Sequence, residues 1–135
     1  MQKLLLGPLG PVVARLSSFG RFCTSMRSIA GLPLAEQELQ WHWQLLVRAN
    51  GRAVMPKIIQ YIRERRYYRT RWTAALQQAN IPLHLIIGDR DPISGKAIAA
   101  RWRTLLPNSP VTALEGVGHY PQWEAPMQVL AAMDG

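Results

Sequence analysis

The sequence predicts an α/β protein in which helices precede a β-α-β-α unit. A short apolar run at residues 83–87, interrupted only by His84, lies between Pro82 and Gly88, which is typical of a strand buried on both faces. A second short strand is expected at residues 111–114, after the turn Asn108-Ser109-Pro110, and the segment between the two strands has helical spacing of its apolar side chains. Two strands joined by a helix form a right-handed parallel crossover, so we expect them to be neighbours in one sheet.

The N-terminal 31 residues contain arginines and serines but no acid, since the first carboxylate of the chain is Glu36. Such a composition is typical of a mitochondrial presequence. The alternative is that this segment forms short helices, with Val12, Val13 and Leu16 on one helical face and Phe19 and Phe22 following. We expect a cytoplasmic protein and keep mitochondrial targeting as the alternative.

Further helices are expected between this segment and the first strand. One lies within residues 32–50, a second covers residues 56–68 with Pro56 in its first turn, and a third is a short stripe at residues 72–79. The apolar faces of these helices are Leu39, Trp43, Leu46 and Val47; Met55, Ile58, Ile59 and Ile62; and Trp72, Ala75, Leu76 and Ala79.

The C-terminal part alternates strand and helix. Ser94 is a suitable N-cap for the helix after the first strand, and Pro121 starts the last helix. The apolar faces of these two helices are Ile98, Trp102 and Leu105; and Trp123, Met127, Leu130 and Ala131. Two strands are too few for a stable sheet, so we expect an incomplete sheet with an uncovered edge through which the chain could self-associate.

The composition excludes several classes of protein. The 135 residues include a single cysteine, Cys23, so an internal disulfide is impossible, and no Cys/His cluster has the spacing of a zinc site. No apolar run is long enough to span a bilayer. The formal net charge of +8 raises the question of an anionic partner. We expect no metal and no cofactor.

The residue types that can carry chemistry follow the two predicted strands. Asp91 comes just after the first strand, and His119 lies in the glycine-bearing loop after the second. Loops at the carboxyl ends of neighbouring parallel strands meet at one edge of the sheet. A carboxylate that accepts a hydrogen bond from an imidazole fixes its tautomer and leaves the other ring nitrogen free as a general base. Asp89 is the second candidate for the acid.

A basic stretch at residues 63–71, RERRYYRTR, contains Tyr67 and Tyr68 among its arginines. Basic residues with interleaved aromatic rings can bind phosphates and stack on bases. The alternative is a solvated helix face whose tyrosines point inward, and we favour this alternative because helical periodicity already explains the apolar positions.

Two of these segments resemble the α/β-hydrolase superfamily. IPLHLIIGDRDPIS resembles its penultimate strand and acid loop, and GVGHYPQWEAP resembles its histidine loop and the start of its last helix. YIRERRYYRTRWTAAL resembles the lid of the branch that includes epoxide hydrolases, haloalkane dehalogenases and mesoderm-specific transcript. The resemblance covers nearly the whole chain.

The resemblance implies a division and a set of roles. Residues 1–80 would be the helical lid, and residues 81–135 the C-terminal part of the hydrolase core. Asp91 would be the acid, because the family has glycine, two residues and then the acid, and His119 would be the base. The other positions matched to the family are Glu124 and Pro126, with capping and packing roles, and the lid tyrosines Tyr61, Tyr67 and Tyr68, which in epoxide hydrolases donate hydrogen bonds to the ring oxygen.

The chain departs from the family in the nucleophile. It contains no G-x-S-x-G motif and no oxyanion loop, and both precede the lid in this superfamily. We therefore expect a fragment that keeps acid and base and is inactive alone. Its parent would use a nucleophile–His–Asp triad on a small molecule with an ester, epoxide or carbon–halogen bond. The alternative function is a non-enzymatic basic module that binds nucleic acid or anionic membrane.

Overall fold

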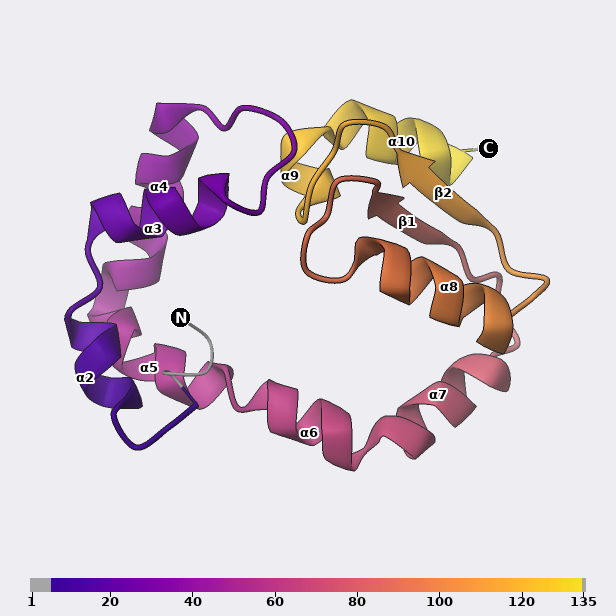
Figure 1. Cartoon of the computed structure of the whole chain (residues 1–135), viewed down its shortest axis with the longest axis horizontal. Coiled ribbons are helices and arrows are strands. Elements are labelled where there is room, and N and C mark those ends of the chain that lie inside the picture. The colour runs from indigo at the N-terminus through magenta and orange to yellow at the C-terminus, as the bar shows by residue number, and fades with distance from the viewer. Residues whose placement is uncertain (1–5, 135) are drawn as a thin grey trace. The chain divides into compact units, whose positions relative to one another are not determined.

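The computed structural model describes residues 6–134, and it shows helices together with a small parallel sheet (Figure 1). The chain divides into two compact units. The first contains residues 6–24 and 35–72, and the second contains residues 25–34 and 73–134. The combination of helices with a two-stranded parallel sheet is consistent with the predicted α/β class. The predicted division into lid and core at residue 80 stays a prediction, as does the targeting role of the N-terminal segment, whose residues 1–5 lie outside the described part.

The first unit is helical. Its elements, with α3 and α7 each continuing into the second unit, are α2 (Gly10–Arg15), α3 (Phe19–Arg27), α4 (Glu36–Val47), the 3-10 helix η1 (Arg48–Asn50), α5 (Gly51–Ile58), α6 (Tyr61–Tyr67) and α7 (Arg69–Gln77). The short N-terminal helices of the alternative interpretation are therefore present. The expected face of α2 is not buried, since Val12 and Leu16 are exposed and Ala14 is the side chain that packs inward.

The helix expected within residues 32–50 is confirmed as α4, which ends at Val47; in η1, directly after it, Ala49 and Asn50 adopt positive φ angles of 49° and 62°. These angles turn the chain sharply before α5. The ring of Trp43 in α4 lies 5.7 Å from the ring of Phe22, centroid to centroid, so α4 and the N-terminal part of α3 are in contact.

The prediction of one helix over residues 56–68 is wrong. The helix α5 begins at Gly51, so Pro56 lies inside it rather than in its first turn, and α6 is a separate helix. Proline has no N–H for an intrahelical bond. Beyond Pro56 the helix ends at Ile58, and the N–H of Gln60 donates to the carbonyl of Lys57, a tighter turn than an α-helix makes.

The second unit contains the sheet. Its elements are β1 (Leu85–Gly88), α8 (Gly95–Leu105), β2 (Val111–Leu114), α9 (Pro121–Glu124) and α10 (Pro126–Asp134). Strands β1 and β2 are parallel, with Leu85 opposite Val111 and Gly88 opposite Leu114, and α8 and α10 flank them (Figure 1). The β-α-β order is confirmed. Within residues 6–134 each strand pairs only with the other, so self-association through an edge stays a prediction.

The core of this unit lies beneath the histidine loop. Leu114, Val117 and Ala125 are buried, and they pack against Leu32, Ile86, Val129 and Ala132. The last helix differs from the prediction in two ways. It is broken at Ala125, because a residue before proline avoids the helical conformation. Met127, at 74%, and Leu130 of its predicted apolar face are exposed, since Val129 and Ala132 face the core instead.

Among residues 6–134 the helices all fall short of the length and hydropathy that a membrane span requires.

Candidate active site

The two candidate loops leave the same edge of the sheet. After β1 ends at Gly88, the N–H of Asp89 donates to the carbonyl of Leu114, the last residue of β2. One residue further, the N–H of Arg90 donates to the carbonyl of Val117 at 2.9 Å. The acid loop and the histidine loop therefore run side by side from the point where the strands end.

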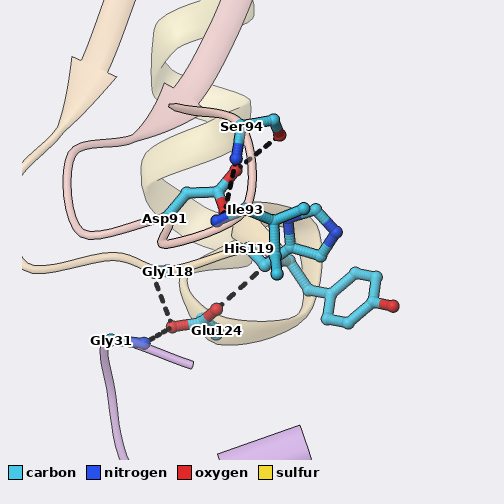
Figure 2. A network of polar contacts seen from close by, with 8 residues as sticks. Gly31, Asp91, Ile93, Ser94, Gly118, His119 and Glu124 are labelled. Carbon is cyan, nitrogen blue, oxygen red and sulfur yellow. Dashed lines mark hydrogen bonds and ion pairs between the residues drawn. The ribbon is translucent and has the colours of Figure 1, made fainter. Parts of the chain in front are cut away.

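Asp91 and His119 are in direct contact, as Figure 2 shows. The distance from His119 Nδ1 to Asp91 Oδ1 is 2.9 Å. The side chain of Asp91 is 8% exposed and that of His119 is 25% exposed, so the acid is covered and the ring remains accessible. The two residues that the sequence singled out, 28 positions apart, thus lie together. Their catalytic role stays a prediction.

The carboxylate of Asp91 is held by its own loop. Its Oδ1 accepts from the N–H of Ile93 at 2.8 Å and of Ser94 at 3.3 Å, and its Oδ2 accepts from the Ser94 hydroxyl at 2.9 Å. Burial acts to raise the pKa of Asp91, but the hydrogen bonds from Ile93, His119 and Ser94 outweigh it, so the pKa lies below its ordinary value. Ser94 does occupy the predicted N-cap position of α8, but its hydroxyl bonds Asp91 and makes no cap bond.

The ionised acid determines the tautomer of the histidine. A carboxylate can only accept hydrogen bonds, so the 2.9 Å contact requires that His119 Nδ1 carry a proton. In the neutral ring, Nε2 then has a free lone pair. This arrangement can take a proton at Nε2 and stabilise the resulting imidazolium through Asp91.

The histidine loop is fixed at consecutive backbone N–H groups. The N–H of His119 donates to the carbonyl of Ile29 at 2.9 Å. The N–H groups on either side, those of Gly118 and Tyr120, donate to the carboxylate of Glu124 at 2.9 and 3.1 Å. Gly116 adopts a φ of 75°, which favours glycine and lets the loop turn.

Glu124 is the residue of this site that the sequence reasoning undervalued. Besides the two loop bonds, its Oε2 accepts from the N–H of Gly31 at 2.7 Å and of Leu32 at 3.0 Å (Figure 2 draws the Gly31 bond). Burial acts to raise the pKa of Glu124, but these backbone N–H groups lower it below its ordinary value. The expected role was capping and packing of the last helix. The partners of Glu124 lie 92 and 93 residues away, and no local pattern indicates them.

Asp89, the second candidate for the acid, does not contact His119. Its Oδ1 accepts from the N–H of Gly116 at 2.8 Å, so it supports the start of the histidine loop. The other histidines also have partners: His84 bonds the hydroxyl of Thr112, and His42 bonds the carbonyl of Glu38. His119 is the histidine that meets the carboxylate of Asp91.

The lid-like tyrosines lie in the first unit and are exposed. Tyr67 is 82% exposed, and its ring packs edge-on against Tyr68, which stacks on Trp72 with ring centroids 5.9 Å apart. The expectation that these tyrosines point inward is wrong. Tyr61 and Tyr67 lie in α6 and Tyr68 follows it directly, and none of the residues of α6 is buried.

A hollow of the second unit lies away from the Asp91–His119 pair. It has a volume of about 920 Å³ and lies at the amino ends of the strands, lined by Leu83, Pro110 and neighbouring residues. Because chemistry in open α/β sheets occurs at the carboxyl ends of strands, we assign no role to this hollow. In the described part of the chain, no group of three or more His, Cys, Asp or Glu side chains could hold a metal ion.

The comparisons with known proteins find relatives that agree with the resemblance to α/β-hydrolases. No protein-family model matches the chain. The protein named "Putative hydrolase LipZ" from Mycobacterium tuberculosis (strain H37Rv) is 39% identical over 128 residues, which cover 93% of this chain and 44% of LipZ. The mesoderm-specific transcript protein of Mus musculus is 36% identical over 141 aligned positions, covering 100% of this chain and 42% of that protein.

The chain therefore spans less than half the length of these curated relatives. The similarity supports a relationship to the α/β-hydrolases, and the name of LipZ suggests a hydrolase-like function.

Proposed function

We propose that this chain is the lid and C-terminal core of an α/β-hydrolase and that it supplies the acid and the base of a nucleophile–His–Asp triad. The observation that carries the proposal is the 2.9 Å contact between His119 Nδ1 and Asp91 Oδ1 at the carboxyl edge of two parallel strands. The similarity to a protein named as a hydrolase supports the same reading.

In the proposed reaction, Asp91 keeps the proton of His119 on Nδ1, and Nε2 takes the proton of the attacking group. With a serine nucleophile, Nε2 would accept the hydroxyl proton as the acyl-enzyme forms and return it to the leaving group. With an aspartate nucleophile, Nε2 would accept a proton from the water that releases the covalent intermediate. The substrate is a small molecule with an ester, epoxide or carbon–halogen bond.

The proposal needs a nucleophile that these 135 residues do not carry in a G-x-S-x-G motif. Coverage of 44% of LipZ leaves room for one in a longer polypeptide. We therefore expect the 135-residue chain alone to give no ester or epoxide turnover above the buffer rate, because a base without its nucleophile contributes little. Robust turnover that is abolished by His119→Ala would contradict this expectation.

A chimera tests the site itself. This chain would replace the matching 128-residue segment of LipZ, and hydrolysis of p-nitrophenyl esters and of an epoxide would be followed. If the chimera is active, His119→Ala should lower kcat by about 10³-fold or more and Asp91→Asn by about 10²- to 10⁴-fold.

The matched control in the chimera is His84→Ala, because His84 bonds Thr112 outside the candidate site. It should leave kcat within about threefold, as expected for a side chain without a catalytic role. An active chimera that loses nothing on His119→Ala would overturn the proposed role of the base.

The exposed aromatic rings of the first unit favour a second candidate function, namely binding of single-stranded nucleic acid by residues 61–72. Tyr67, Tyr68 and Trp72 present ring surface to solvent, and arginines lie among them in the sequence. One of these, Arg65, has its guanidinium 5.9 Å from the ring centre of Tyr61. Arginines pair with phosphates, and exposed rings stack on bases.

Fluorescence anisotropy with a labelled single-stranded oligonucleotide tests this candidate. A phosphate binder should lose affinity steeply between about 50 and 200 mM salt, and Arg65→Gln with Arg66→Gln should reduce the salt slope by about two. Arg101→Gln, on an exposed position of α8, is the matched control. Absence of salt-sensitive binding, or binding to anionic vesicles alone, would reject this candidate.

A further inference from the structure

The segment at residues 29–32, which we call the strap, lies against the histidine loop although almost ninety positions separate them in the sequence. The strap carbonyl of Ile29 accepts the N–H of His119. The approach is close: a Cβ added to Gly118 would lie 2.7 Å from the carbonyl carbon of Ala30, a distance that real Cβ atoms essentially never show. The strap and the loop are therefore in backbone-to-backbone contact.

One side chain holds both pieces. The carboxylate of Glu124 accepts from Gly31 and Leu32 in the strap, and from Gly118 and Tyr120 in the loop. We propose that Glu124 is a positioning residue for His119: it clamps the strap to the histidine loop so that the imidazole is held within hydrogen-bond distance of Asp91. This inference rests on the proposed function, in which that contact orients the base.

The geometry separates this role from general packing. The N–H groups of Gly118, His119 and Tyr120 are consecutive, and each is fixed, two directly by Glu124 and the middle one by the strap that Glu124 holds. Fixing the backbone on both sides of a residue restricts where its side chain can point. The ring of His119 therefore depends on a group that it does not touch.

The chemistry of the clamp requires a carboxylate. All four partners are N–H donors, and an ionised carboxyl group has only acceptors. A glutamine in its place would keep one acceptor oxygen but would turn an NH₂ group towards donors. Glu124→Gln therefore removes charge and acceptor capacity without changing the size of the side chain.

The test measures alignment directly and needs no catalysis. In the full chain, the proton on His119 Nδ1 should give a far-downfield NMR signal while it bonds Asp91, and the amides of the strap and loop should be protected from hydrogen exchange. Glu124→Gln should abolish the downfield signal and speed exchange of the Gly31, Gly118 and His119 amides by roughly 10- to 100-fold, the range expected when bonds to a charged acceptor are lost.

Two further variants distinguish the clamp from a general effect of charge and from the contact between Asp91 and His119. Glu115→Gln makes the same charge change at an exposed position of the same loop, and it should alter neither readout. Asp91→Asn should abolish the downfield signal while the Gly31 and His119 amides stay protected, because it leaves the bonds of Glu124 and of the strap in place. Loss of the downfield signal in Asp91→Asn shows that the signal reports the contact between Asp91 and His119, which belongs to the proposed function. Loss of the signal in Glu124→Gln shows that this contact depends on the clamp.

A downfield signal and a protected His119 amide that both survive Glu124→Gln would overturn the proposal. If Glu124→Gln does not fold, amide hydrogen exchange in the unmodified chain tests the proposal instead. The amides of Gly31, Leu32 and His119 should then open together, with one common opening equilibrium, because one carboxylate holds them. Independent opening of the His119 amide would overturn the proposal equally.

Discussion

Gly31→Ala should destabilise the second unit strongly, because the strap passes too close to the histidine loop for a side chain at this position. A Cβ at Gly31 would lie 2.7 Å from Gly118 N and from Val117 C, and it would overlap the carbonyl oxygen of Gly116. All three are backbone atoms, so no flexible side chain can move aside. To reach an ordinary contact of 3.4 Å with Gly118 N and Val117 C, strap and loop would have to separate by at least about 0.7 Å (3.4 minus 2.7), and clearing the Gly116 oxygen requires more.

That separation acts on the clamp. The bond from Gly31 N to Glu124 Oε2 is 2.7 Å, and stretching it by about 0.7 Å or more brings it to or beyond the limit of a hydrogen bond. A lost bond to a charged acceptor costs about 1.5–3 kcal/mol, and the residual crowding adds about 1–3 kcal/mol. We therefore expect Gly31→Ala to lower the free energy of unfolding by about 3–5 kcal/mol.

Urea unfolding measures this change, followed by circular dichroism and by the NMR amide signals of Val117 and Gly118 in the second unit. The control is Gly20→Ala. Gly20 lies on an exposed position of α3, and an added Cβ would meet nothing within 4 Å, so this substitution should stabilise the chain by about 0.5–1 kcal/mol. A Gly31→Ala variant within about 0.5 kcal/mol of the unmodified chain would refute the close approach of strap and loop.

Acid should destabilise the second unit, because the pKa values of both Asp91 and Glu124 lie below their ordinary values of 3.8 and 4.5. Their contribution is fully present above those ordinary values and is lost as the pH falls through the lowered pKa values, so urea midpoints should be flat at neutral pH and drop below about pH 4.5. Asp89→Asn should cost about 1 kcal/mol or less and leave the His119 Nδ1 proton signal unchanged, since Asp89 bonds only Gly116 among the partners found. Tyr67→Ala should change the free energy of unfolding by no more than about 0.5 kcal/mol, because the side chain is 82% exposed; a larger loss in thermal melts would show that the ring packs.

The acid side of the site could be predicted from the sequence because its determinants are local. A short apolar run ending at Gly88 predicts β1, and the same stretch supplies Asp91 and the residues that bond it, Ile93 and Ser94. The parallel crossover then places His119 at the same edge. Periodicity and turn residues are sufficient for each of these steps.

What the sequence did not reveal depends on contacts between distant segments. The stretch around residue 31 contains Gly31 and Pro33 and has no period, so it reads as a connection, yet in the structure it is the strap. Glu124 reads as a first-turn acid of a short helix, which is where acids are favoured in any case, so its longer-range bonds are hidden. The break between α5 and α6 was missed for a different reason, because a proline near the end of an apolar stripe can start one helix or end another.

The acid and the base thus depend on the fold in different ways. Asp91 is held by groups two and three residues away, and these bonds can form as soon as its loop closes on the first turn of α8. His119 is held by Glu124 and by the strap at residues 29–32, which is about ninety positions away in the sequence. Its ring is therefore positioned only when the strap is bound to the histidine loop. Local openings cost less than global unfolding, and an opening that separates the strap from the histidine loop breaks the bonds of Glu124 to Gly31 and Leu32. The imidazole should therefore lose its alignment in partial openings that leave the carboxylate in place, which makes the histidine loop, rather than the acid loop, the part of this site whose geometry limits the proposed reaction.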